Sequence, residues 1–289
     1  HRHAVAGVDT VDVVAGSIHT TSTDGTTVLA RFEQRSVVVA IGLAPGADVR
    51  SVPQHIAAVR RWLDLDASPA VIDEHLARQA ALAPWVTRHA GLRVPTALDP
   101  FRSLTATILG QQVSVAAAAT QCGRLTRHLE TGQRFPTAAE LAAADPDLLA
   151  SALGVPKARG RTLVAVAQLV AGGDVALGPS ADRDEATALL GAVRGIGPWT
   201  IAETRMRALG DPDVWPAGDL VLRREVSDGG MFPGLQPGQC APWRSYLAQH
   251  VWVAHATSTL AASPDARTRA KSATHSNDSE DPRYAKEAQ

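Results

Sequence analysis

The chain has 289 residues, of which 45% are hydrophobic, and its formal net charge is −1. This length suffices for one large domain or two smaller ones with a sizeable core, and the near-neutral charge neither favours nor excludes a nucleic-acid partner. The two cysteines, Cys122 and Cys240, are too few for a four-thiolate iron–sulfur cluster or a cysteine-rich zinc site within this chain. They are typical of free thiols in a reducing compartment.

Other classes of site and location are also disfavoured. His250 and His255 stand five residues apart, which would place them on different faces of a helix, so we expect no metal site there. The sequence shows no signal peptide and no apolar run of membrane-spanning length, so we expect a cytoplasmic protein without cofactors. Because the first residue is His1 rather than Met, we expect the N-terminal domain to be truncated at its start.

Residues 10–42 alternate in polarity and are rich in Val and Thr, which predicts three or four antiparallel strands. Turn signals at Ala15-Gly16 and Asp24-Gly25 separate these strands. From about Ser51 the spacing of Ala, Leu and Arg becomes helical, with helices predicted over 56–65 and 69–90 and interruptions at Pro69 and Pro84.

Residues 99–130 form the longest helical pattern, which Asp99 begins as an N-cap with Pro100 in the first turn. The GQQVS stretch in its middle predicts two helices that meet near residues 111–114. The fold class is therefore α+β: a small antiparallel N-terminal sheet with helices, followed by an all-helical domain. We place these domains at residues 1–90 and 91–262, and we expect the polar tail at 263–289 to be disordered.

A short glycine motif stands between two helical patterns. Gly195-Ile196-Gly197 follows residues 184–194, and Pro198 then suits the first turn of a helix over 198–209. This arrangement predicts a tight hairpin in which Ile196 points inward while the neighbouring N–H groups face an anion at the helix N-terminus. A glycine cap between two packed helices is the alternative interpretation.

Asp219 follows this helix and a loop, and it opens another helical segment, LVLRREV. Its common role would be that of an N-cap. The alternative is a functional carboxylate that is held at a helix start and faces whatever lies beyond the hairpin.

Taken together, these stretches resemble a known family. The GIGPWT stretch at 195–200, the GDPDVWP stretch at 210–216 and Asp219 look like the helix-hairpin-helix DNA glycosylase superfamily. ILGQQVSVAAA (108–118) and PWRSYLAQHVW (242–252) are similar to its bacterial 3-methyladenine DNA glycosylase II branch. The resemblance covers roughly residues 1–255 and implies a helix-hairpin-helix glycosylase domain that acts on double-stranded DNA with alkylated bases.

The resemblance also implies roles for three residues. Asp219 matches the catalytic aspartate, which would stabilise the positive charge that develops on the sugar as the base leaves. Trp199 matches the aromatic wall of the base pocket, where an indole face attracts a cationic base. Trp252 matches a second pocket position. For both tryptophans the alternative is an ordinary core aromatic.

Five further residues receive roles from the resemblance. Ile196 and Thr200 belong with the two glycines to the phosphate-binding hairpin, which is also expected to hold a monovalent cation through backbone carbonyls. Gln112 matches the wedge that fills the gap left by a flipped base, although the family pattern is apolar there, and Gln111 is expected in the base pocket. The alternative for both is a pair of solvent-facing glutamines. Glu203 stands where the branch often has an aromatic residue, so it would either pair with a cationic base or face solvent.

The sequence contains no lysine between Lys157 and Lys271. Superfamily members that also cut the DNA strand use a lysine amine at the position of Trp199 to form a Schiff base. We therefore expect a monofunctional, monomeric glycosylase that removes 3-methyladenine-type bases in base excision repair, with an upstream fused domain absent from this chain. The alternatives are a bifunctional glycosylase/lyase for oxidised bases and a non-enzymatic helix-hairpin-helix DNA-binding module.

Overall fold

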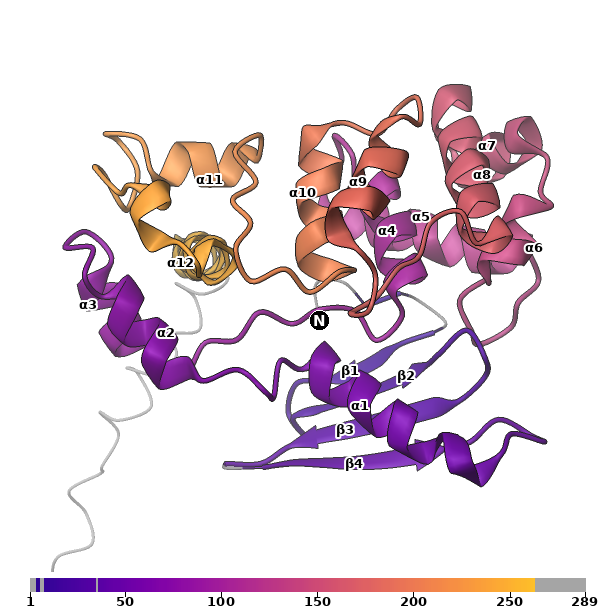
Figure 1. Cartoon of the computed structure of the whole chain (residues 1–289), viewed down its shortest axis with the longest axis horizontal. Coiled ribbons are helices and arrows are strands. Elements are labelled where there is room, and N and C mark those ends of the chain that lie inside the picture. Colours follow the sequence, from indigo (N-terminus) through magenta and orange to yellow (C-terminus); the bar gives the residue numbers. More distant parts are fainter. Residues whose placement is uncertain (1–3, 6–7, 35, 263–289) are drawn as a thin grey trace, which may run out of the picture.

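The structure is a computed structural model that describes residues 4–5, 8–34 and 36–262, and it shows a four-stranded sheet followed by helices (Figure 1). This is the α+β fold that the sequence predicts. The tail predicted to be disordered, 263–289, lies outside the described residues. The domain boundary placed at residue 90 stays a prediction.

The sheet is an antiparallel meander with the strand order β1-β2-β3-β4. Its strands are β1 (Thr10–Asp12), β2 (Ser17–Thr21), β3 (Thr27–Phe32) and β4 (Val37–Gly42). The predicted turns are confirmed, because both fall between consecutive paired strands. Val28 and Ala30 point to the same face of β3 and pack with Val59 and Leu63, which belong to the α1 region that covers the sheet (Figure 1).

The helices follow the sheet in chain order. They are α1 (Val52–Trp62), α2 (Pro69–Leu76), α3 (Ala83–Arg88), α4 (Pro100–Leu109), α5 (Val115–His128), α6 (Ala138–Ala142), α7 (Pro146–Leu153), α8 (Lys157–Gly172), α9 (Arg183–Gly191), α10 (Pro198–Arg207), α11 (Leu220–Glu225) and α12 (Arg244–Ala262). The described residues also contain two 3-10 turns, Val49–Ser51 and Pro237–Cys240. Among the described residues, no helix combines the length and the apolar character that a bilayer crossing requires.

Local signals set the helix starts that were predicted. Asp99 caps α4 by accepting a hydrogen bond from the backbone N–H of Arg102, and Pro100 occupies the first turn. Ser114 caps α5 in the same way through the N–H of Ala117. The two helices therefore meet over residues 110–114, as the sequence predicts. Pro69 likewise begins α2.

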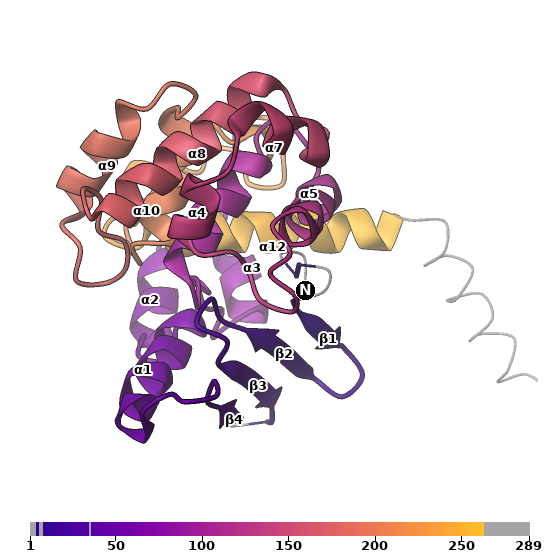
Figure 2. The same cartoon turned by 90° about the vertical axis from the view of Figure 1, so that its right-hand side faces the viewer.

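The helical part has two hydrophobic cores, and α10 contributes to both. One core joins α4, α5, α7, α8 and α9 around side chains such as Leu104 and Leu163. The other joins α2 and α3 to α11 and α12 around Ile72, Leu222 and Val251. Figure 1 shows α10 between these groups of helices, while Figure 2 shows α12 running behind them. The helix that follows the hairpin thus forms the wall between the two lobes.

Both cysteines are free, as predicted, and both are buried. Burial raises the pKa of the Cys122 thiol to about 12 and that of Cys240 to about 11. These thiols are therefore protonated and poorly nucleophilic at neutral pH.

Candidate active site

The hairpin has the predicted shape, and its two glycines differ in backbone conformation and in the space around them. Gly195 has φ of +98°, and a Cβ there would lie 2.4 Å from Oγ1 of Thr162. Gly197 has an ordinary extended conformation, and a Cβ there would meet no atom within 4 Å among the described residues other than its chain neighbours. Ile196 points inward and is 9% exposed within the first core. Gly195 is thus required by the fold, whereas Gly197 leaves open space beside the start of α10.

The α4–α5 junction lies against this hairpin. The Nε2 atom of Gln111 donates to the carbonyl of Gly195 and to Oγ1 of Thr200, both at 2.9 Å. The Gln111 carbonyl in turn accepts a hydrogen bond of 2.9 Å from Arg159. The solvent-facing interpretation of Gln111 is therefore wrong: its side chain braces the hairpin.

Gln112 stands next to this brace and differs from it. Its side chain is exposed, and its φ of 59° lies in the left-handed region that residues other than glycine rarely adopt. Such strain persists only where the surroundings impose it and often marks a functional position. The junction therefore presents an exposed polar side chain next to the residue that contacts the hairpin.

Three elements converge on Asp219. Its Oδ1 atom caps α11 by accepting from the N–H of Leu222 at 2.9 Å, and it also accepts from Nε1 of Trp252 at 3.2 Å. Its Oδ2 atom accepts from Nε1 of Trp199 at 3.3 Å. The N-cap prediction is confirmed, and the carboxylate is held in addition by an indole from α10 and another from α12. Three donors complement its negative charge and fix its position.

A second carboxyl lies on the same side of α10. The side chain of Glu203 is only 13% exposed, and its Oε2 atom lies 3.9 Å from Nε of Arg207. Its Oε1 atom is buried and has no hydrogen-bond partner among the described residues. Burial raises the pKa of the Glu203 carboxyl, the charge of Arg207 opposes this shift, and the charge of Asp219 adds to it. The solvent-facing interpretation of Glu203 is therefore wrong.

Arg207 is the site residue that the sequence analysis missed. It donates hydrogen bonds to the carbonyl of Pro95 at 2.7 Å and to Oε1 of Gln249 at 2.8 Å. Its guanidinium carbon lies 5.4 Å from the ring centroid of Trp252, within range of a cation–π contact. Its spacing of four residues after Glu203 and eight after Trp199 places the three on one helix face. This spacing is the feature of the sequence from which Arg207 could have been predicted to lie near the site.

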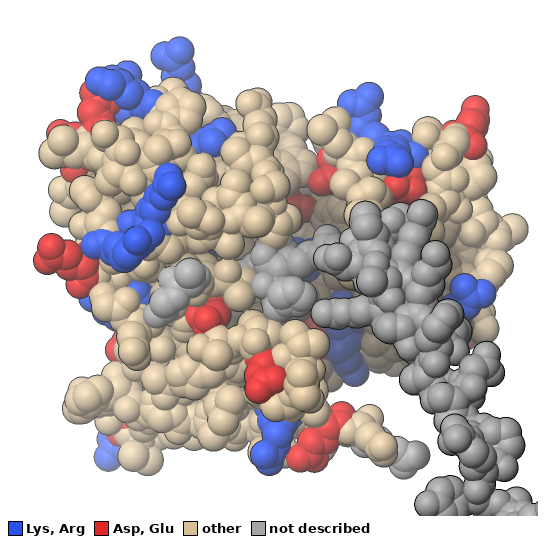
Figure 3. Space-filling view, turned by 180° about the vertical axis from the view of Figure 1, so that it is seen from behind, with Lys and Arg blue, Asp and Glu red and all other residues tan. Residues whose placement is uncertain are grey.

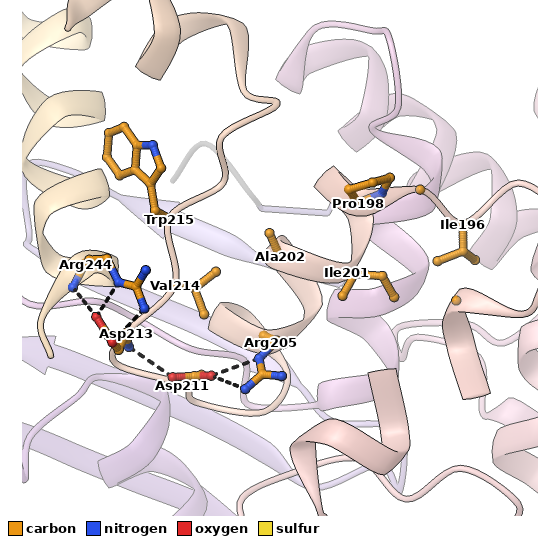
Figure 4. A pocket seen from close by; sticks show the side chains of 12 residues that line it. Ile196, Pro198, Ile201, Ala202, Arg205, Asp211, Asp213, Val214, Trp215 and Arg244 are labelled. Carbon is orange, nitrogen blue, oxygen red and sulfur yellow. Dashed lines mark hydrogen bonds and ion pairs between the residues drawn. The ribbon is translucent and has the colours of Figure 1, made fainter. Parts of the chain in front are cut away.

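A cavity of about 520 Å³ lies beside α10 but does not include this cluster. Figure 4 shows its lining, with Ile201 and Ala202 of α10 on one side and the loop that carries Asp211 and Asp213 on the other. Its charged groups are already paired, because Arg244 bonds Asp213 at 2.7 Å and Arg205 bonds Asp211 at 2.9 Å. The charged side chains that line this cavity therefore hold the loop against α10 and α12. The candidate catalytic group is instead the carboxylate of Asp219.

Two further observations bear on ions and charge. The described residues contain no group of three or more His, Cys, Asp and Glu side chains suited to a metal ion. The monovalent cation expected at the hairpin carbonyls stays a prediction, and the Gly195 carbonyl already accepts a bond from Gln111. On the face seen in Figure 3, Lys and Arg are interspersed with Asp and Glu, so the visible part of this face is mixed in charge.

The chain matches two family models that together span most of its length. Residues 1–99 match the AlkA N-terminal domain, and residues 105–235 match the HhH-GPD superfamily base excision DNA repair protein. The first match covers the sheet with α1 to α3, and the second covers the hairpin and Asp219.

Curated relatives agree with this assignment. A "probable bifunctional transcriptional activator/DNA repair enzyme AlkA" of Mycobacterium tuberculosis is 38% identical over 71% of this chain, but the chain spans only 43% of that protein's length. DNA-3-methyladenine glycosylase 2 of Escherichia coli is 32% identical over 86% of this chain and 90% of its own length.

Solved structures show the same fold at lower identity. The 3-methyladenine DNA glycosylase from Archaeoglobus fulgidus has a TM-score of 0.69 at 19% identity over 86% of this chain and 90% of its own. An 8-oxoguanine glycosylase/lyase from Clostridium acetobutylicum, solved with duplex DNA, has a TM-score of 0.65 at 14% identity over 88% of this chain and 89% of its own. The fold alone therefore does not separate the two activities. The sequence matches do place the chain: it belongs to the HhH-GPD superfamily of base excision DNA repair proteins, in the branch with an AlkA N-terminal domain.

Proposed function

We propose that this chain is a monofunctional DNA glycosylase that removes alkylated purines of the 3-methyladenine type by hydrolysis of the N-glycosidic bond. One observation carries the proposal: the Asp219 carboxylate is held between the indole N–H groups of Trp199 and Trp252, next to the helix that follows the hairpin. The curated relative from Escherichia coli, which the chain covers almost completely, is named for that activity.

The geometry supports a simple sequence of events. A base inside a duplex must be turned out before an enzyme reaches its glycosidic bond. Gln112 would fill the gap in the duplex, and the hairpin N–H groups beside Gly197 would hold the backbone phosphate. The rings of Trp199 and Trp252 would then bind the base. As the bond breaks, the sugar becomes oxocarbenium-like, and the Asp219 carboxylate stabilises that charge and orients the attacking water.

The two competing functions fit less well. A strand-cutting lyase needs an amine that forms a Schiff base, and Trp199 occupies the position where the resemblance would place that lysine. A DNA-binding module needs the hairpin glycines but has no use for a carboxylate held by two indoles. The deciding experiment is a time course of base release from methylated duplex DNA. We expect free 3-methyladenine and an intact strand with an abasic site, whereas strand cleavage in step with release would favour the lyase.

Several finer expectations are part of this proposal. The partner is double-stranded DNA with alkylated bases, bound by a monomer without a cofactor. A cytoplasmic location and an upstream fused domain stay predictions. A sedimentation measurement with and without duplex tests the expected one-to-one complex.

Trp199→Ala should reduce the preference for cationic over neutral bases. A cation over an indole face contributes about 1–2 kcal/mol when desolvated, so the ratio of 3-methyladenine to hypoxanthine release should fall by roughly tenfold. Trp199→Phe is the matched control, because it keeps an aromatic face and loses the N–H that bonds Asp219. It should slow both releases and keep most of the preference. An unchanged ratio in the alanine variant would remove Trp199 from the base pocket.

Gly197→Val should weaken binding to any duplex without altering base preference, because hairpin N–H groups contact phosphate, which positions but does not specify. Among the described residues, apart from its chain neighbours, a Cβ at Gly197 has no atom within 4 Å, so we expect the variant to fold. Gly195→Val should also bind less well, but for another reason. A side chain at this position is disfavoured by the φ of +98° and by the nearby Thr162, so the substitution should lower the free energy of unfolding. Melting curves beside binding titrations separate the two. Normal duplex binding by folded Gly197→Val would contradict the assignment.

A further inference from the structure

One face of α10 brings opposite charges to the proposed base pocket. Trp199, Glu203 and Arg207 follow one another at intervals of four residues, so they lie in a row along that helix. Across from this row, Asp219 bonds the indole of Trp199, and the ring of Trp252 lies under the guanidinium of Arg207. Glu203 thus stands between a pocket tryptophan and a buried cation.

The formal charges of this cluster do not cancel. Arg207 is positive at any physiological pH, and its hydrogen-bond acceptors, the Pro95 carbonyl and Gln249, are neutral. Burial and the charge of Asp219 raise the pKa of Glu203, and Arg207, 3.9 Å away, opposes this shift and favours the ionised form, because buried charges persist when they are paired. Because Asp219 adds a second carboxylate, the ionised cluster carries one net negative charge, which matches a base with one positive charge.

Glu203 also has unused bonding capacity. Its Oε1 atom is buried and accepts no hydrogen bond from the described residues. A buried acceptor without a partner costs free energy, and a ligand that supplies an N–H or a positive charge recovers it. Gln111, the other polar residue expected in the base pocket, is already committed to the hairpin.

We infer that Glu203 is a specificity-determining residue that restricts excision to positively charged bases, because its carboxylate stabilises such a base in the pocket and opposes the negative charge that a neutral purine gathers as it leaves. This inference rests on the proposed function and goes further, because it names the property by which one class of base is selected. Selection against the competitor is as effective as attraction of the correct partner.

The chemistry of the bond explains the discrimination. When the bond between C1′ and the base nitrogen breaks, its electron pair stays with the base. A cationic alkylated purine leaves as a neutral molecule, and the oxygen of water bonds to C1′ while its proton passes to solvent. A neutral purine leaves with a negative charge until it takes up that proton. Relative to the unflipped duplex, a fixed negative charge beside the leaving base raises the barrier for the neutral purine alone, because the attraction that the cationic base gains in the pocket only offsets what it loses as it leaves as a neutral molecule.

The test is Glu203→Gln, which keeps the size of the side chain and removes its charge. Single-turnover release is measured for 3-methyladenine from methylated duplex and for hypoxanthine, a neutral purine, from a matched duplex. We expect the ratio of the cationic to the neutral rate to fall by about tenfold, since one charge a few ångströms away at an effective dielectric of about 20 is worth at least that factor. Hypoxanthine release should stay the same or rise.

Glu203→Asp is the matched control, because it keeps the charge and should keep most of the wild-type ratio, and melting curves verify that both variants fold. An unchanged ratio in folded Glu203→Gln would overturn the inference and leave Glu203 as a structural partner of Arg207. A selective loss of hypoxanthine release would also overturn it, because the carboxyl would then be a proton donor to neutral bases. If the wild-type chain releases no 3-methyladenine, the proposed function fails and this inference fails with it, whereas release with an unchanged ratio sinks the inference alone.

Discussion

Asp219→Asn should leave a folded protein that binds DNA and releases bases about 10²–10³ times more slowly than wild type. Asparagine caps a helix about as well as aspartate, so the bond from Leu222 and the bond from Trp252, both to Oδ1, are retained. The NH₂ group of the asparagine would replace Oδ2 and face the indole N–H of Trp199, so that two hydrogen-bond donors would oppose each other. That mismatch should cost about 1 kcal/mol of stability, far less than the loss of a negative charge where positive charge develops.

The measurement is single-turnover base release beside a melting curve and a titration with a duplex that contains an abasic site. Asp182→Asn is the matched control, because Asp182 also caps a helix, α9, through two backbone N–H groups and bonds no indole in the described part of the chain. It should keep the wild-type rate. Near-normal excision by folded Asp219→Asn would move the catalytic role elsewhere, and Glu203 would be the first residue to examine.

Much of the fold could be predicted because its signals are local. The alternation of residues 10–42 with glycine turns determines a meander, whatever packs on it. Asp99, Ser114 and Asp219 begin helices because a short polar side chain satisfies N–H groups within the next turn. The packing of α2 and α3 against α12 had no such signal, because contacts between residues 69–88 and the end of the chain leave no periodic pattern in either segment.

The site divides in the same way. The hairpin and the Asp219 cap were predictable from composition and spacing. That Gln111 braces the hairpin while its neighbour Gln112 is exposed was not, because a single left-handed residue at the α4–α5 junction sends two identical side chains in different directions. The burial of Glu203 could not be predicted either, because a carboxyl on a helix usually faces solvent. Its partner, Arg207, is recognised only once the folded structure shows that both side chains are buried.

Arg102→Met should cost about 3–5 kcal/mol of unfolding free energy, the largest stability loss we expect from one substitution outside the site. Arg102, on α4, pairs with Asp9, whose side chain is 6% exposed. The same carboxylate accepts from the N–H of Val5 and from Oγ1 of Thr20 on β2, each at 2.6 Å. It therefore ties the start of the described chain and the sheet to the helical domain. Without Arg102 its charge stays buried and uncompensated.

The melting temperature should fall by about 2–4 °C for each kcal/mol lost in a chain of this size. Arg60→Met is the matched control, because the pair of Arg60 with Asp66 joins side chains that are 52% and 62% exposed, and its melting temperature should hardly move. Adding Asp9→Asn to Arg102→Met removes the stranded charge and should restore part of the loss. If Arg102→Met melts like Arg60→Met, water reaches Asp9, and the sheet is held to the helices by apolar contacts of Val5 and Val8 with the first core instead.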